Sequence, residues 1–300
     1  MLTREKPSGE NAVLGESPAF VIGAAVMMLS PFLVVDLREV RWRRERHHFA
    51  SRSWRIRVLD SGAAPVSLKS QFHLMGTKGM PDHNLLLSVE GIDATGKTEI
   101  ALAIEDALGQ HSLRVYGVHD PPQELDPWPQ VKALMFDRQS EASEISEAWF
   151  FLAARLDMVQ REIVPALSEE AFVIADRYVD SWVAYHCHRL SKHFESLEES
   201  IDFLSNIHLA LSSAGLLPFP RRTWLVEDDP GEAMKRRAGA ASKWETLETQ
   251  RNVATAYEMI ASRDPRRIIR IDARGRPFEA VRNRVVTEAI EYCIDEANVF

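Results

Sequence analysis

The segment at residues 91–98, with the sequence GIDATGKT, constrains the fold of this 300-residue chain more than any other feature. It follows an apolar run at residues 85–90 and precedes an amphipathic stretch that begins at Lys97. A glycine-containing loop between a strand and a helix aims its backbone N–H groups at a point ahead of the helix, where they bind phosphate oxygens. The spacing and its context therefore predict a loop that binds the phosphates of a nucleoside triphosphate.

Individual residues of this loop have predicted roles. The glycines let the backbone approach the phosphates closely, Lys97 reaches the β- and γ-phosphates, and Thr98 binds Mg²⁺ through its hydroxyl. The residues expected to hold the nucleotide are Gly91, Asp93, Ala94, Thr95, Gly96, Lys97 and Thr98. The loop does not identify the reaction, because GTPases, motors and small-molecule kinases all carry it.

Short apolar runs alternate with amphipathic stretches from residue 85 onward. We predict strands at residues 85–90, 113–118, 171–176, 222–227 and 267–272. Helices are predicted at residues 97–108, 143–167, 195–213 and 277–297, with another that begins at Ser181. This alternation is typical of βαβ units. The sequence thus predicts an α/β fold of the P-loop NTPase type at residues 81–300, a doubly wound parallel five-stranded sheet with helices on both faces.

Composition narrows the functional classes. The net charge of −8 gives the chain no bulk electrostatic attraction to DNA or RNA, so no nucleic-acid partner is expected. Cys187 and Cys293 are the only cysteines, which is too few for a disulfide framework. Their scarcity favours a reducing, cytoplasmic location.

Residues 1–80 differ from the rest of the chain and are predicted to be an N-terminal extension. They carry an excess of basic residues, whereas residues 81–300 are acidic. The uncharged run at residues 17–35 would span roughly 28 Å as a helix, about the thickness of a bilayer core. It is either a membrane span, which would leave the C-terminal portion in the cytoplasm, or part of a disordered or mis-started leader. Membrane contact is expected only through this run.

Several motifs follow one another along residues 85–295. The strand before the loop ends in Glu90 and runs into Gly-Ile-Asp, and residues 151–155 have a Phe-x-x-x-Arg pattern. Residues 176–185 contain Asp-Arg-Tyr, a serine and an Ala-Tyr pair, and the series continues at residues 220–237 and 271–281. In these ordered motifs the chain resembles the thymidylate kinase family. The similarity does not cover residues 1–80.

The resemblance implies a reaction. A member of this family transfers the γ-phosphoryl group of ATP to a deoxynucleoside monophosphate, most often dTMP to give dTDP, with Mg²⁺ as cofactor. The acceptor is a phosphate whose second pKa is about 6, so no strong general base is required. The resemblance also implies a homodimer.

The acceptor site is expected to involve residues from several segments. Arg177 directly follows the third predicted strand, where ligands bind in open α/β sheets, and by resemblance it clamps the acceptor phosphate. Phe151 and Arg155, four residues apart, share a helix face; by resemblance they stack on a pyrimidine and donate to its ring carbonyl. Tyr185 resembles the family tyrosine that lies against the sugar, and Asp120 completes the predicted substrate-binding set. Ordinary core positions for Phe151 and Tyr185 remain open.

Transfer of a phosphoryl group requires further cationic side chains and a metal ion to neutralise the negative charge of the phosphate oxygens. Arg236 and Arg237 lie in the position of the family's lid, and with Lys97 and Arg177 they form the predicted catalytic set. Asp176, together with Thr98, is the candidate ligand of Mg²⁺ or of its water shell.

Some residues depart from the family pattern. Asp157 stands where a glutamine is usual, and a carboxylate beside the base would change which ring atoms are recognised. His119 and His186 are further departures. These departures motivate one alternative, a nucleotide-binding module without activity. A second alternative is a deoxynucleoside kinase in which Asp120, followed by Pro121, is the general base.

Overall fold

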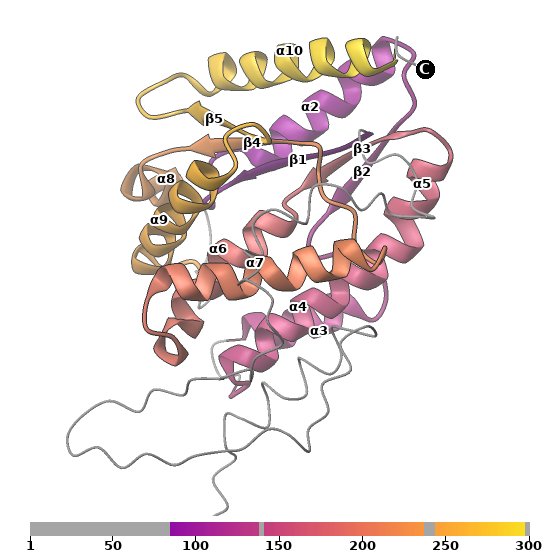
Figure 1. Ribbon diagram of the computed structural model, residues 1–300. Helices are drawn as coiled ribbons and strands as arrows, with labels where there is room; N and C mark the ends of the chain where they lie inside the picture. The colour runs from indigo at the N-terminus through magenta and orange to yellow at the C-terminus, as the bar shows by residue number, and fades with distance from the viewer. Residues whose placement is uncertain (1–84, 138–140, 237–243, 298–300) are drawn as a thin grey trace, which may run out of the picture. The chain divides into compact units, whose positions relative to one another are not determined.

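The computed structural model describes residues 85–137, 141–236 and 244–297 (Figure 1). They contain a five-stranded sheet in which neighbouring strands are parallel and the order is β2-β3-β1-β4-β5. The strands lie within two residues of the predicted ones, so the doubly wound α/β fold is confirmed. Their bounds are β1 (Leu86–Gly91), β2 (Val115–His119), β3 (Phe172–Asp176), β4 (Arg222–Glu227) and β5 (Ile268–Asp272).

Helices cover both faces of the sheet, as predicted (Figure 1). On one face α2 (Lys97–Gln110) and α10 (Phe278–Ala297) pack together, and Ile104 and Val285 belong to the same buried cluster. On the other face a second cluster contains Trp182, Leu204 and Tyr257. These residues come from α6 (Val179–Leu190), α7 (Leu197–Ser213) and α9 (Leu247–Arg263), and a short 3₁₀ segment (Ser191–His193) follows α6.

The region predicted as one long helix at residues 143–167 is divided in the structure. It comprises α4 (Glu144–Met158), a π-helical turn (Val159–Ile163) and α5 (Val164–Ser168). Ser143 caps the start, where its hydroxyl accepts a hydrogen bond from the backbone N–H of Ser146 at 3.2 Å. Pro165 has no N–H to donate to the carbonyl four residues earlier, and its ring crowds that carbonyl. The wider π-helical turn accommodates this proline.

Three helices of the described residues were not predicted from the sequence: α3 (Trp128–Phe136), α8 (Pro230–Arg236) and α9. The buried residues of α9, among them Val253, Tyr257 and Ile260, recur at helical spacing, so this helix was detectable in the sequence and was overlooked. In α3 only Met135 is buried, which leaves no apolar period to detect.

The sheet order places the predicted functional segments side by side. β1 leads into the phosphate loop and pairs with β3, in the register of Val89 with Asp176. The carboxylate of Glu90, buried at the end of β1, accepts hydrogen bonds from the backbone N–H of Tyr178 at 2.7 Å and from the hydroxyl of Tyr257 at 2.8 Å. The turn after β3 is therefore tied to the loop after β1, at the edge where parallel sheets bind ligands.

The predicted N-terminal extension and its apolar run at residues 17–35 lie outside the described residues. The described residues all belong to the unit that runs from Met75 to Phe300. No helix within the described ranges is both long enough and apolar enough to span a bilayer. The extension and the boundary at residue 80 therefore stay predictions.

A buried ion pair offers a test of how this fold is held together. Arg267 makes two hydrogen bonds, of 2.7 and 2.8 Å, to the two oxygens of Asp180 in α6. The Arg267→Met variant would leave the Asp180 carboxylate buried without its partner. We expect the free energy of unfolding, measured by urea denaturation, to fall by about 3–5 kcal/mol.

The double variant Asp180→Leu/Arg267→Met should recover much of this loss, because it removes both buried charges. Equal unfolding free energies for the single and the double variant would contradict this expectation.

Candidate active site

A cavity of about 870 Å³ lies at the carboxyl ends of the central strands. It collects residues from the phosphate loop, from the ends of β2 and β3, and from α4 and α6. Among the predicted site residues its lining includes Asp93, Ala94, Thr95, Gly96, Lys97, Thr98, Asp120, Phe151, Arg155, Asp176, Arg177, Tyr185 and Arg236. Gly91 lies just behind it in β1, and Arg237 lies outside the described residues.

The phosphate loop has the backbone that its glycines allow. Gly91 and Gly96 have φ angles of +146° and +83°. A Cβ at Gly91 would stand 2.5 Å from the carbonyl oxygen of Val226 in β4, so that position admits no side chain without displacement of the strand. The loop is therefore closely packed against the sheet.

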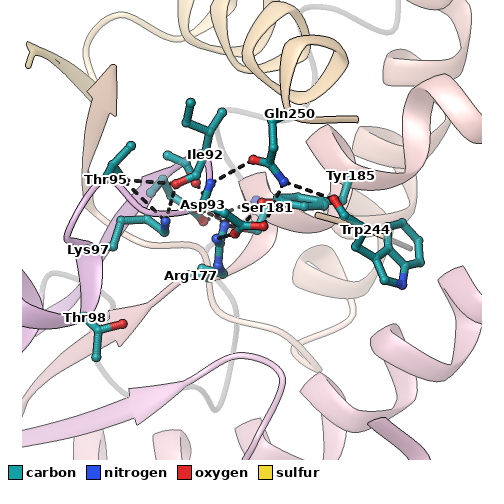
Figure 2. A network of polar contacts seen from close by, with 12 residues as sticks. Ile92, Asp93, Thr95, Lys97, Thr98, Arg177, Ser181, Tyr185, Trp244 and Gln250 are labelled. Carbon is teal, nitrogen blue, oxygen red and sulfur yellow. Dashed lines mark hydrogen bonds and ion pairs between the residues drawn. The ribbon is translucent and has the colours of Figure 1, made fainter. Parts of the chain in front are cut away.

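Lys97 folds back along the loop. Its ammonium group donates hydrogen bonds to the carbonyl oxygen of Ile92 and, at 3.4 Å, to the hydroxyl of Thr95 (Figure 2). Burial, followed by the nearby charge of Arg177, lowers the pKa of Lys97 to about 7. Lys97 lines the cavity, and an anion bound there would raise its pKa and favour the charged ammonium form.

Thr98 and Asp176 form a corner that suits a magnesium ion. The Thr98 hydroxyl donates to Asp176 Oδ2 at 2.5 Å, and His119 Nδ1 lies 3.0 Å from the same oxygen. Burial alone would raise the pKa of Asp176, but hydrogen bonds from His119 and Thr98 and the charge of Arg177 hold that pKa well below its usual range. The other oxygen, Oδ1, is buried and has no hydrogen-bond partner among the described residues. An anionic oxygen beside a hydroxyl fits the oxygen-ligand preference of Mg²⁺.

Arg177 points at the phosphate loop. Its guanidinium forms an ion pair with Asp93, donates to the carbonyl oxygen of Gly91 at 2.9 Å, and lies 5.1 Å from the centre of the Tyr185 ring. The Tyr185 hydroxyl donates to Asp93 at 2.9 Å. The acidic neighbour of Arg177 in sequence, Asp176, is not its ion-pair partner. The arginine is thereby held at the junction of the two predicted nucleotide sites.

An aromatic pocket surrounds Phe151. The rings of Phe136 and Trp244 lie 6.0 Å from that of Phe151, and His186 lies 5.5 Å from it. Burial lowers the pKa of His186 to about 3, so its imidazole is neutral. The pocket can hold a flat heterocycle.

Arg155 is almost fully committed to protein partners. Its Nε donates to Asp120 Oδ2 at 2.6 Å, and its Nη2 forms an ion pair with the same carboxylate. Nη2 also donates to the carbonyl oxygen of Tyr178 at 3.1 Å. Nη1 lies 3.0 Å from His208 Nε2. A guanidinium has five N–H groups, so one on Nη1 is left for a ligand. Asp120 thus orients Arg155, a function that sequence reasoning did not assign to it.

Other predicted residues lie differently from expectation. The Asp157 carboxylate accepts from Trp128 Nε1 at 2.7 Å and from Arg161 at 3.0 Å, and it does not line the cavity. The expectation that Asp157 stands beside the base is therefore wrong.

Arg236 lies near the phosphate loop, where it pairs with Asp228 and donates to the carbonyl oxygen of Ala94 at 3.4 Å.

Sequence reasoning missed several residues that line or support the cavity, among them Lys132, Trp244, Gln250 and Phe278. Lys132 and Gln250 lie in helices that were not predicted. Phe278 is an exposed aromatic residue at the start of α10, and its ring lies against Gly96. Of these four residues, only Phe278 fell within a predicted helix.

A family model for thymidylate kinase matches residues 89–285. The chain belongs to the thymidylate kinase family. A thymidylate kinase from Verminephrobacter eiseniae is 33% identical over 63% of this chain and 84% of that protein. A probable thymidylate kinase from Methanosarcina mazei is 29% identical over 69% of this chain and 96% of that protein. A solved thymidylate kinase structure from Candida albicans covers 69% of this chain and 92% of that one, with a TM-score of 0.56 and 24% identity.

The family assignment confirms the resemblance inferred from the ordered motifs. It makes the chain a nucleoside monophosphate kinase, a phosphotransferase of nucleotide biosynthesis. The alternatives of a deoxynucleoside kinase and of an inactive nucleotide-binding module are not favoured.

The low pKa of Lys97 gives a measurable pH dependence. The free protein loses the Lys97 proton near pH 7, whereas the charge of a bound triphosphate favours the ammonium form. Binding of ATP at pH 8 should therefore be accompanied by proton uptake, and the affinity should fall as the pH rises from 7 to 9. Calorimetry in buffers of different ionisation enthalpy measures this uptake.

Lys97→Arg provides the matched control, because a guanidinium stays charged over this range. If the wild-type protein takes up no more protons than Lys97→Arg at pH 8, the nucleotide does not change the protonation of Lys97 and the expectation is contradicted.

Proposed function

We propose that this chain transfers the γ-phosphoryl group of ATP to dTMP and releases dTDP. The observation that supports this most strongly is the single cavity that joins the phosphate loop, Arg177 and the aromatic pocket around Phe151 and Arg155. A donor triphosphate and an acceptor monophosphate would therefore meet within one cavity.

On the donor side, residues 91–98 would hold the triphosphate through backbone N–H groups at the start of α2. Lys97 would leave its contacts within the loop and turn to the β- and γ-phosphates. Thr98 and Asp176 would hold Mg²⁺ or its water shell. The ion would neutralise the charge that the phosphate oxygens carry during transfer.

On the acceptor side, Arg177 is the group that would clamp the monophosphate, because a guanidinium can bind two phosphate oxygens at once. Phe151 would stack on the base, and the remaining N–H of Arg155 would donate to a ring carbonyl. Tyr185 would lie against the sugar. Arg236 and Arg237 would add positive charge near the transferring group, as predicted from their position in the lid.

The role of Asp120 follows from its contact with Arg155. A carboxylate committed to a buried guanidinium is a poor base for a sugar hydroxyl, whereas a phosphate acceptor needs no such base. The arrangement thus supports a monophosphate as the acceptor.

A panel of acceptors tests the proposal. The full chain with ATP and Mg²⁺ should phosphorylate dTMP in preference to dCMP, dAMP, dGMP and thymidine, measured as formation of labelled product. Lys97→Ala should abolish turnover. Arg155→Met should lower kcat/KM for dTMP by about tenfold or more, since it removes a hydrogen bond to the base and also leaves the buried Asp120 carboxylate without its partner. No preference for dTMP would refute the acceptor assignment.

We also propose a homodimer in the cytoplasm. Support for self-association comes from three apolar side chains exposed on α4, namely Ile145, Trp149 and Phe150. Support for the location comes from Cys187 and Cys293, which are buried free thiols.

The dimer has its own test. Sedimentation equilibrium should give twice the chain mass of 34.0 kDa. Ile145→Glu/Phe150→Glu should shift this towards one chain mass, because charges at a dimer interface are costly. Leu102→Glu, at an exposed position on α2, is the control and should leave the mass unchanged. A dimer that survives the α4 substitutions would place the interface elsewhere.

A further inference from the structure

Gln250 is hydrogen-bonded to Asp93 of the phosphate loop and to Trp244 of the aromatic pocket (Figure 2). It is fully buried in the first turns of α9. Its Oε1 accepts a hydrogen bond from the backbone N–H of Asp93 at 2.8 Å. Its Nε2 donates to Asp93 Oδ2 at 2.8 Å and to the carbonyl oxygen of Trp244 at 3.1 Å.

The chemistry of these partners fixes the orientation of the amide. One partner is an N–H donor, and the other two are oxygen acceptors that receive the two hydrogens of Nε2. A carboxamide is the side chain that combines one acceptor with two donors in this planar shape. No other neutral side chain of this size would make all three bonds.

Both partners of Gln250 belong to the active site. Asp93 is part of the phosphate loop, and its Oδ1 receives hydrogen bonds from Arg177 and from the Tyr185 hydroxyl. The Trp244 ring lies within 6.4 Å of the rings of Phe151, Tyr185 and His186 in the acceptor pocket. Gln250 therefore touches the donor loop directly and the acceptor pocket through Trp244.

We propose that Gln250 is a positioning residue that couples the donor loop to the acceptor pocket. By holding Asp93 from one side, it leaves the other carboxylate oxygen to aim Arg177 and Tyr185 at the acceptor. By holding the backbone of Trp244, it sets the wall against which the base packs. The inference rests on the proposed function and assigns a new residue to it.

The Gln250→Glu variant tests this role through its pH profile. When ionised, the introduced carboxylate would have no hydrogen to donate to Asp93 Oδ2 or to the Trp244 carbonyl oxygen. Its burial beside the Asp93 carboxylate would raise its pKa. Protonation restores a donor to Asp93. We expect kcat/KM for dTMP, relative to the wild type at the same pH, to be reduced about tenfold or more at pH 8. This ratio should rise severalfold as the pH falls to 6.

Two further variants keep the test decisive. Gln250→Met, which has similar size but no hydrogen bonds, should be impaired at every pH without recovery. Gln110→Glu, the same substitution at an exposed site at the end of α2, should follow the wild-type profile. Thermal unfolding of each variant identifies those that fold as the wild type does.

The outcomes separate two failures. Suppose that the wild-type chain phosphorylates dTMP. The role of Gln250 alone is then overturned if Gln250→Glu follows the wild-type pH profile or if Gln250→Met is fully active. A wild-type chain with no turnover on any monophosphate overturns the proposed function, and the role of Gln250 with it.

Discussion

The parallel pairing of β1 with β3 determines where the charged groups of the site lie. Because the two strands point the same way and stand next to each other, the phosphate loop after β1 and the Asp176–Arg177 turn after β3 emerge at one edge. Backbone hydrogen bonds fix this register, and the Glu90 carboxylate ties the two turns together. A shift of β3 by one residue relative to β1 would turn the β3 side chains to the opposite faces of the sheet and would move the Asp176–Arg177 turn out of line with the phosphate loop.

The cavity contains an unusual density of buried charge, and nearly every charge has a partner. Arg155 is held by Asp120, Arg177 by Asp93, and Asp176 by His119 and Thr98. Removal of a charge from water costs several kcal/mol unless hydrogen bonds replace the water. The few polar groups left without a partner among the described residues, such as Asp176 Oδ1 and one N–H of Arg155, are therefore the positions where a ligand would complete the network.

Much of the fold was accessible from the sequence, whereas the site was accessible only in part. Strand positions could be predicted because central parallel strands are buried on both faces and so consist of short, nearly continuous apolar runs, such as β1 and β3. Helix α3 could not, because Met135 is its only buried residue, whereas α9 has buried residues at helical spacing and was overlooked. Asp157 was misplaced for a related reason: its direction depends on Trp128, which lies in the undetected α3.

The identity of the phosphate loop was determined by the sequence alone, since its eight contiguous residues carry the glycines, the lysine and the threonine that the chemistry needs. The order of the later motifs along the chain was likewise determined by the sequence alone. Tertiary structure alone decided which polar groups became partners. Asp120 meets Arg155 across 35 residues of chain, and Gln250 meets Asp93 across 157. A buried donor pairs with whichever acceptor the packing of sheet and helices brings within about 3 Å, and local sequence carries no record of that choice.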